Sequence, residues 1–214
     1  MIGYASSTAT ESRIGLPERS AHGGYGHLRW SPYHAHALTT AMLRGSSDRL
    51  AHSLQAAMQA RRVLATVSTA DADLLVSAAL LHDIGYAPAL RQTGFHPIDG
   101  ARFLLRLGAP TRLAALVAHH SESRLLAEAV GLLAPLSSFL REEGPVTDAL
   151  TYADMTAGPT GAPMTIADRL ADIAARHANE DPVMVAARLA RVPRLMAAAE
   201  RVQSRVLVTD PAPL

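Results

Sequence analysis

The sequence predicts an all-α fold with about eight to nine helices. From about Pro32 onward, apolar residues recur at helical spacing, and the breaks between these segments fall at Gly, Pro and Asn. We see no confident strand, because no segment has the alternation of apolar and polar residues that is typical of one. The chain has 214 residues, of which 49% are hydrophobic, enough for one domain with a sizeable core. We therefore expect a single helical domain over residues 32–214.

Residues 1–31 form a polar leader in this prediction. They mix Ser, Thr, Gly, His and Arg with little periodicity, which indicates an extended or mobile segment. His22 and His27 lie in the leader, and His34 and His36 follow at the start of the helical body. These histidines stand among small polar residues without framing carboxylates, so we do not assign them to a metal site.

The first two helices are predicted from their breaks and caps. A short helix should cover residues 33–43, because Gly45 and the serines after it interrupt the pattern. Ser47 or Asp48 can cap the next helix, which carries His52.

The third helix should be the central one. Thr69 opens it, and its surface is apolar nearly all round, which is typical of a buried helix. It leads to the dipeptide His82-Asp83. Gly85 and Pro88 then mark its end and the start of a loop that reaches Gly94.

The remaining helices follow from proline and capping signals. Pro97 suits the first turn of a fourth helix, which ends at Gly108, and Pro110 starts a fifth that leads to His119-His120. Thr165, with Asp168 three residues later, gives a capping-box-like start to another helix. The other helical stretches are expected at about residues 122–140, at about residues 146–156, and in a last helix that runs to about Val206.

Composition excludes several classes of function. The chain has no cysteine, which excludes disulfides, thiolate metal sites and a cysteine nucleophile. A net charge of +1 gives no reason to expect a nucleic-acid or anionic-membrane partner. Residues 1–10 lack the features of a signal peptide and no apolar run reaches membrane-spanning length, so we expect a cytoplasmic protein. All 20 basic residues are arginine, which we attribute to codon usage in a G- and C-rich genome.

Histidine and carboxylate groups bracket the dipeptide His82-Asp83. Such groups hold divalent transition metals, and six of them are enough for two ions that share ligands. They fall at the ends or in the first turns of five predicted helical segments, which is how a helical bundle brings side chains to one internal site. The stations are, in chain order, His52, His82-Asp83, His96, His119-His120 and Asp154.

Asp83 is the expected bridge between two ions. Neighbours on a helix point about 100° apart, so His82 and Asp83 do not chelate one ion as an i, i+4 pair does. At a helix terminus, His82 can serve one metal while the two oxygens of Asp83 connect it to a second. A buried, ionised carboxylate is expensive without compensation, and a metal supplies it. His52 taken alone would more often be a hydrogen-bonded core histidine.

The order of these stations resembles the HD-domain superfamily of metal-dependent phosphohydrolases. The run His82-Asp83-Ile84-Gly85 resembles its HDIG variant, and His96-Pro97 with Gly100 resembles the segment that supplies a ligand in dinuclear members. The resemblance covers roughly residues 49–176. It implies an all-α HD-domain helical bundle with a dinuclear metal centre.

The resemblance also implies roles for individual residues. One metal would be held by His52, His82, Asp83 and Asp154, and the other by Asp83, His96 and His119. We prefer His119 to His120 because it falls three positions after Leu116, with His120 as the alternative ligand or a catalytic group that faces the substrate. The ions are expected to be Fe, Mn, Co, Ni or Zn, since nitrogen-rich ligation argues against an exclusively magnesium site.

The implied activity is hydrolysis of a phosphoester or phosphoanhydride of a nucleotide or small phosphorylated metabolite. A water that bridges the two ions would lose its proton and attack phosphorus. Arg49, one helical turn before His52, is the best candidate for gripping phosphate, ahead of Arg91, Arg102 and Arg106. The expected partners are this small molecule and, in a homodimer, a second copy of the chain, with neither nucleic acid nor membrane.

Two departures from the family and two alternatives complete the prediction. Tyr86 stands where many HDIG proteins carry lysine, and the Gly-Tyr-Pro signature of cyclic-di-GMP phosphodiesterases does not follow His119-His120. The first alternative is a mixed-valent di-iron oxygenase on the same scaffold, which no residue excludes. The second is a non-catalytic nucleotide-binding module. Such modules usually lack one or more metal ligands, whereas every ligand position is filled here. We expect substrate specificity to come from residues 86–95 and 155–164.

Overall fold

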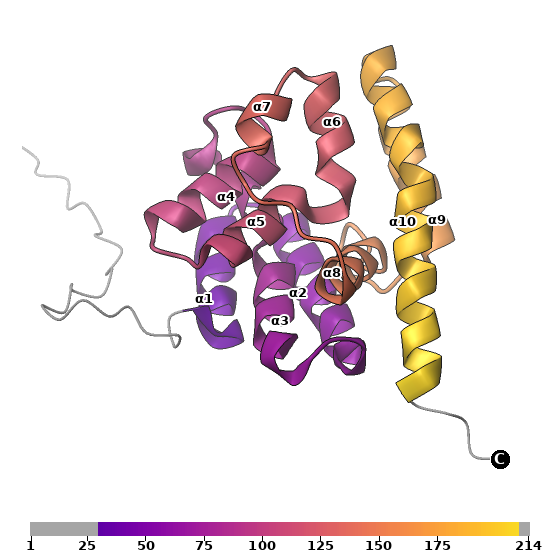
Figure 1. Cartoon of the computed structure of the whole chain (residues 1–214). Coiled ribbons are helices and arrows are strands. Elements are labelled where there is room, and N and C mark those ends of the chain that lie inside the picture. The colour runs from indigo at the N-terminus through magenta and orange to yellow at the C-terminus, as the bar shows by residue number, and fades with distance from the viewer. Residues whose placement is uncertain (1–29, 210–214) are drawn as a thin grey trace, which may run out of the picture.

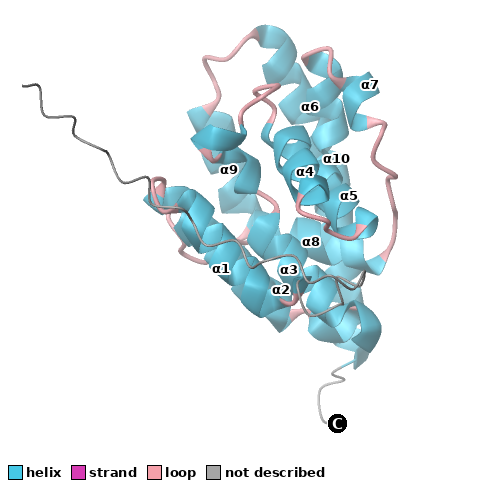
Figure 2. Ribbon diagram, turned by 90° about the vertical axis from the view of Figure 1, so that its left-hand side faces the viewer, coloured by secondary structure: helices cyan, strands magenta, loops and turns pink. Residues whose placement is uncertain are grey.

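The computed structural model describes residues 30–209. Within this range the fold is all-α, as predicted, and its only β-type pairing is an isolated bridge between Ala157 and Pro163. Figure 2 shows helices joined by loops throughout this part of the chain. Residues 1–29, with His22 and His27, lie outside the described residues, so the prediction of a polar leader stays a prediction.

Three N-terminal helices pack together and carry the first candidate ligands. They are α1 (Pro32–Leu43), α2 (Ser47–Arg62) and α3 (Ala72–Leu81). In Figure 1, α3 lies beside α1 and α2, and both neighbours contact it. The bounds agree closely with the predicted ones, except that a 3-10 turn over Thr69–Asp71 precedes α3. The N-cap of α2 is Ser46 rather than the predicted Ser47 or Asp48, and its side chain makes no capping hydrogen bond.

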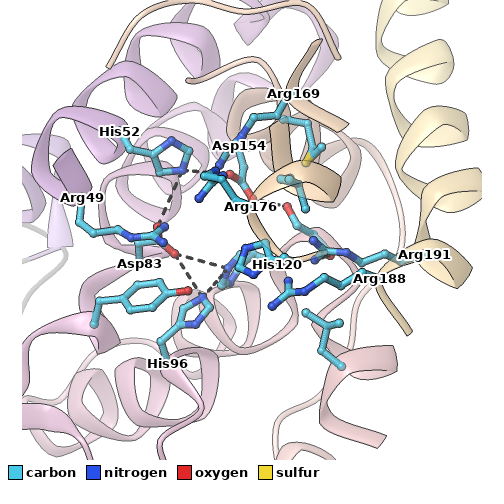
Figure 3. Close-up of a pocket in the computed structure, with 16 residues that line it drawn as sticks. Arg49, His52, Asp83, His96, His120, Asp154, Arg169, Arg176, Arg188 and Arg191 are labelled. Carbon is cyan, nitrogen blue, oxygen red and sulfur yellow. Dashed lines mark hydrogen bonds and ion pairs between the residues drawn. The ribbon is translucent and has the colours of Figure 1, made fainter. Parts of the chain in front are cut away.

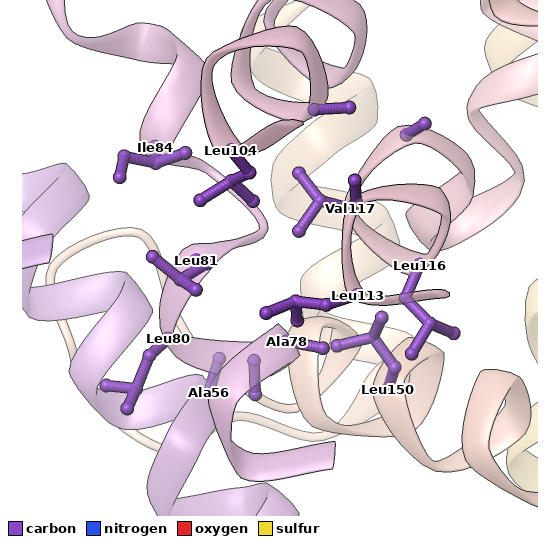
Figure 4. Packing of buried hydrophobic residues seen from close by; sticks show 14 of the residues in the cluster. Ala56, Ala78, Leu80, Leu81, Ile84, Leu104, Leu113, Leu116, Val117 and Leu150 are labelled. Carbon is purple, nitrogen blue, oxygen red and sulfur yellow. The ribbon is translucent and has the colours of Figure 1, made fainter. Parts of the chain in front are cut away.

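Helix α3 is the buried centre that the sequence predicted. Its last seven residues, from Leu75 to Leu81, are all buried. Figure 4 shows Leu81 of α3 in one core with Leu113 and Leu150, which come from α5 (Thr111–His119) and α8 (Pro145–Met155). The residues at the end of α3 are therefore fixed by packing against at least two other helices, which suits a rigid site.

The helical stretch predicted at about residues 122–140 is split in two. Helix α6 (Ser123–Ala129) ends two residues before Gly131, whose φ of 72° is left-handed and suits glycine. Leu132 N–H donates to the Ala127 carbonyl at 2.7 Å, as in a Schellman motif, and the four-residue α7 (Leu133–Leu136) follows. With the four-residue α7 set aside, the described residues form nine α-helices, in agreement with the expected eight to nine.

The C-terminal helices cover the site. Helix α9 (Ile166–Arg176) begins as predicted, because Thr165 Oγ1 accepts a hydrogen bond from the Asp168 N–H at 3.1 Å. Helix α10 (Pro182–Thr209) packs along α6 and α8 and also contacts α9 (Figure 1). Among residues 30–209, none of the helices combines the length and apolarity that a bilayer crossing needs.

Candidate metal centre

Five helices bring six histidine and aspartate side chains to one place, as Figure 3 shows for most of them. They lie at helix ends or within a helix that faces the core. His52 is in α2, His82 and Asp83 follow α3, His96 is the first residue of α4 (His96–Arg106), His120 follows α5, and Asp154 is in α8. All but His96 are more than nine-tenths buried.

Gly85 is what allows α4 to approach Asp83. A Cβ at this position would lie 2.0 Å from the His96 carbonyl oxygen and 2.7 Å from the Gly100 nitrogen. The turn after α3 therefore packs backbone against backbone on the start of α4. This close approach places the ring of His96 beside Asp83, and it gives a physical reason for glycine after the His-Asp-Ile run.

The first group of ligand atoms gathers around one oxygen of Asp83 and one of Asp154. His52 Nε2 lies 3.0 Å from Asp154 Oδ1 and 3.2 Å from His82 Nε2. His82 Nε2 in turn lies 3.6 Å from Asp83 Oδ2. Ligand atoms of His52, His82 and Asp83 thus lie close enough to one another to hold one ion, and Asp154 Oδ1 lies within 3.7 Å of both histidines.

The second group gathers around the other oxygen of Asp83. His96 Nε2 lies 3.2 Å from Asp83 Oδ1 and 3.3 Å from His120 Nε2. His120 Nε2 is 3.8 Å from the same oxygen. Asp83 thus turns Oδ2 to the first group and Oδ1 to the second, which is the arrangement expected of a bridging carboxylate.

The histidine tautomers fit metal ions. His52, His82 and His120 each direct Nδ1 to a backbone carbonyl, on Gly158, Ala79 and Val117, at 3.1, 2.8 and 2.7 Å. A carbonyl only accepts, so Nδ1 carries the proton and a neutral ring keeps its lone pair on Nε2. Lone pairs of His52 and His82 that face each other at 3.2 Å repel unless a cation lies between them. The donor set therefore fits the group that it was predicted to hold.

Charge in the centre is concentrated on the two aspartates. Burial alone would raise the pKa of Asp83, but His82, His96 and Arg49 hold it well below its usual range. Asp154 is similar, since burial is outweighed by His52 and His82 and its pKa is also well below the usual range. Burial lowers the pKa of His96 to about 4, so this ring is neutral near pH 7. Burial alone would lower the pKa of His52, but Asp154 and Asp83 raise it. Two carboxylates among imidazole rings are a suitable environment for divalent cations.

Tyr86 replaces the expected family lysine with a stack of side chains. Its ring lies parallel to that of His96, with centroids 3.9 Å apart, and the Arg49 guanidinium lies 4.1 Å from its centre on a cation–π contact. Arg49 Nη1 also donates to Asp83 Oδ2 at 3.0 Å. The column formed by Arg49, Tyr86 and His96 orients one ligand and keeps a cation at the site.

The preference for His119 over His120 has to be corrected. His119 Nε2 donates to the Phe139 carbonyl at 2.9 Å, so its ring is turned to the segment after α7 and away from Asp83. Helix α5 ends at His119, and the chain leaves helical geometry at His120, with φ of −55° and ψ of 146°. This exit swings His120, and not His119, to the ligand group of Asp83 and His96.

Ser121 is a site residue that the sequence did not reveal. Its hydroxyl donates to Asp154 Oδ2, which leaves Oδ1 for the His52 side. Ser121 and Glu122 have φ values of 46° and 56°, a left-handed conformation that costs non-glycine residues about 1–3 kcal/mol each. Serine at this turn has no motif that marks it, so only the folded chain connects it to Asp154.

Arginines from the C-terminal helices are the other missed feature. Five arginines line the cavity beside the ligands: the predicted Arg49, Arg169 and Arg176 of α9, and Arg188 and Arg191 of α10. Arg91, Arg102 and Arg106 are not among its lining residues. Tyr86 and Met155, at the edges of the segments expected to set specificity, do line it. All 20 basic residues of the chain are arginine, so residue type alone did not distinguish these four arginines of α9 and α10 from the others.

The comparisons with known proteins agree with this geometry. A family model for the HD domain matches residues 49–180. The match starts at Arg49, contains every candidate ligand from His52 to Asp154, and stops before α10. The comparisons with curated proteins and with solved structures gave no match.

Proposed function

Because this chain belongs to the HD-domain family, whose members are mostly metal-dependent phosphohydrolases, we propose that it hydrolyses a phosphoester or phosphoanhydride of a small molecule. The substrate class is a nucleotide or another small phosphorylated metabolite. The observation that carries the proposal is the pair of facing Nε2 atoms on each side of Asp83.

We assign two divalent transition metal ions, Fe, Mn, Co, Ni or Zn, to the two ligand groups. His52, His82, Asp83 and Asp154 would hold one, and Asp83, His96 and His120 the other. Both ions would stabilise charge on a phosphoryl group and lower the pKa of a bound water. Burial of the ligands supports this assignment, because a dry site strengthens every charge interaction in it.

The chain's own residues have distinct roles in the proposal. Asp83 shares its two oxygens between the ligand groups and so fixes their separation. Arg49 is about one-third exposed and already donates to Asp83, so its remaining N–H groups can bind a phosphoryl oxygen at the rim. His120 and Ser121 complete the ligand side that faces α10.

The alternatives differ from this proposal in a measurable way. Purified full-length chain is loaded with manganese and assayed without oxygen on a panel of phosphomonoesters, phosphodiesters and nucleoside triphosphates. We expect phosphate release that disappears in Asp83→Asn. Oxygen consumption by the ferrous protein without phosphate release would instead identify the di-iron oxygenase, and nucleotide binding without either would identify the non-catalytic module.

A further inference from the structure

Two arginines of the candidate cavity are buried, and the described residues leave the charge of one and an N–H group of the other without a partner. Arg169 is 5% exposed and Arg191 is 8% exposed. Arginine is almost never buried to this extent unless it is paired. Their surroundings therefore show whether the protein itself satisfies them.

Arg191 has only a neutral partner of its own. Its Nη1 donates to the Ser121 carbonyl at 3.2 Å, and none of the carboxylates between residues 30 and 209 forms an ion pair with it. Burial and the neighbouring Arg188 lower the pKa of Arg191, as expected for a cation without a close counter-charge. A buried guanidinium in this position is stabilised if an anion enters the cavity.

Arg169 is partly satisfied. Its Nη1 donates to Asp172 Oδ2 at 2.8 Å, but its buried Nε has no hydrogen-bond partner among the described residues. Arg188, the third of the group, is held by Glu180, which accepts from its Nε at 2.6 Å and its Nη2 at 2.9 Å. Glu180 fixes the position of Arg188 and leaves its Nη1 as a further donor.

The two helices aim these side chains at the metal ligands. Arg188 and Arg191 are three residues apart, so they share one face of α10. Figure 3 shows both reaching from the α10 side toward His120, with Arg169 near Asp154. All three line one cavity of about 80 Å³ together with Asp83, His120 and Asp154.

We propose that Arg169, Arg188 and Arg191 form an anion site that holds a second phosphoryl group next to the one that is cleaved. Guanidinium forks match phosphate oxygens in geometry and charge. The cavity of about 80 Å³ places these arginines close to the metal ligands, so the two bound groups lie close together, as two phosphoryl groups of one molecule do. The substrate is then a phosphoanhydride or a closely spaced bisphosphate, and not a simple monoester. This narrowing rests on the proposed phosphohydrolase function.

A pair of phosphonates tests the site without turnover. Isothermal titration calorimetry on the manganese-loaded full-length chain gives the affinities for methylenebisphosphonate and for methylphosphonate. The quantity compared is the ratio of the first affinity to the second. We expect the ratio to fall by about 10-fold or more in Arg188→Gln and in Arg191→Gln, because each loses a charge-assisted hydrogen bond. Comparing variants cancels chelation of the metal by free bisphosphonate.

Arg194→Gln is the matched control. Arg194 lies three residues after Arg191 on α10 but is half exposed, pairs with Glu122, and does not line this cavity. Its ratio should equal that of the wild type. A thermal melt of each variant shows whether it folds. If Arg191→Gln does not fold, Arg188→Gln carries the test, because Arg188 is the less buried of the two.

The outcomes separate this site from the proposed function. An unchanged ratio in folded Arg188→Gln overturns the anion site, even if the wild type releases phosphate from its substrates. If the ratio depends on Arg188 and Arg191 but no compound of the panel releases phosphate, the anion site stands and the hydrolase assignment is wrong.

Discussion

The cavity has a histidine and aspartate side and an arginine side, and the two are built differently. The first comes from the ends and inner faces of α2, α3, α4, α5 and α8, inside the span that matches the HD domain. Of the second, Arg188 and Arg191 lie in α10, beyond that span. Ligands on the first side satisfy one another through shared atoms, whereas Arg191 on the second has no ion pair among the described residues. The family match therefore covers all the candidate metal ligands and Arg169 of α9, and only the two α10 arginines of the proposed anion site lie beyond it.

Removing the bridge should have the largest effect. Asp83→Asn takes a charged oxygen from both ligand groups, so we expect loss of bound metal and a fall in phosphate release of more than about 100-fold. Mutation of a residue that only orients a ligand typically costs about 10–100-fold. Metal analysis and a phosphate assay measure both. Asp168→Asn, at the exposed start of α9, is the control and should keep both properties.

The adjacent histidines sharpen the comparison within one turn of chain. His120→Ala should remove one ion per chain, and His119→Ala should keep the wild-type number. The latter loses only a hydrogen bond to the Phe139 carbonyl, worth about 1 kcal/mol of stability. Metal stoichiometry and denaturant unfolding of the two variants measure this, and the opposite pattern would restore His119 as the ligand.

Gly85→Ala tests the backbone contact that brings α4 to the site. The added Cβ would lie 2.0 Å from the His96 carbonyl oxygen, so we expect a loss of about 1–3 kcal/mol in the free energy of unfolding. Gly45→Ala is the control, because a Cβ there meets no atom within 4 Å. Equal stabilities of the two variants in urea titration would contradict the account of Gly85.

Ser121→Ala tests the residue that connects the histidine and aspartate side of the cavity to its arginine side. Ser121 binds Asp154 through its hydroxyl and Arg191 through its carbonyl. Loss of the hydroxyl should weaken metal binding by about 10-fold, as is usual for groups that orient a ligand. Competition with a fluorescent chelator gives the affinity. The backbone contact to Arg191 should survive, so the phosphonate ratio should not change.

Arg176→Gln should have the smallest effect. Arg176 lines the cavity, but its side chain is 37% exposed and its Nε and Nη2 are occupied by Asp172. Exposed pairs contribute about 0–1 kcal/mol, so bisphosphonate affinity should change by less than about 5-fold. If Arg176→Gln lost as much bisphosphonate affinity as Arg191→Gln, the burial of an arginine would not determine how much it contributes to binding.

Periodicity and caps predicted most of the fold, because they are local properties. Thr165 was identified as a cap from its spacing to Asp168, and the apolar surface of α3 identified the buried centre. The split between α6 and α7 was missed, because the left-handed conformation of Gly131 was not inferred from its sequence context.

Residue type and order in the sequence were enough to predict most of the candidate ligands. They were not enough where the backbone conformation decides which way a side chain points. His52, His82, Asp83, His96 and Asp154 were found from residue type and order, and the structure brings all of them together. The choice between His119 and His120 depended on the backbone dihedral angles at the end of α5, which the spacing from Leu116 does not encode. The C-terminal arginines depended on tertiary packing of α9 and α10 over the site.

The central claim is that Asp83 bridges two ions, each held on its own side. Anomalous diffraction from crystals of the manganese-loaded full-length chain measures this most directly. We predict two peaks, one among His52, His82 and Asp154 and one between His96 and His120, with Asp83 contacting both. A single peak, or a peak beside His119, would contradict the account.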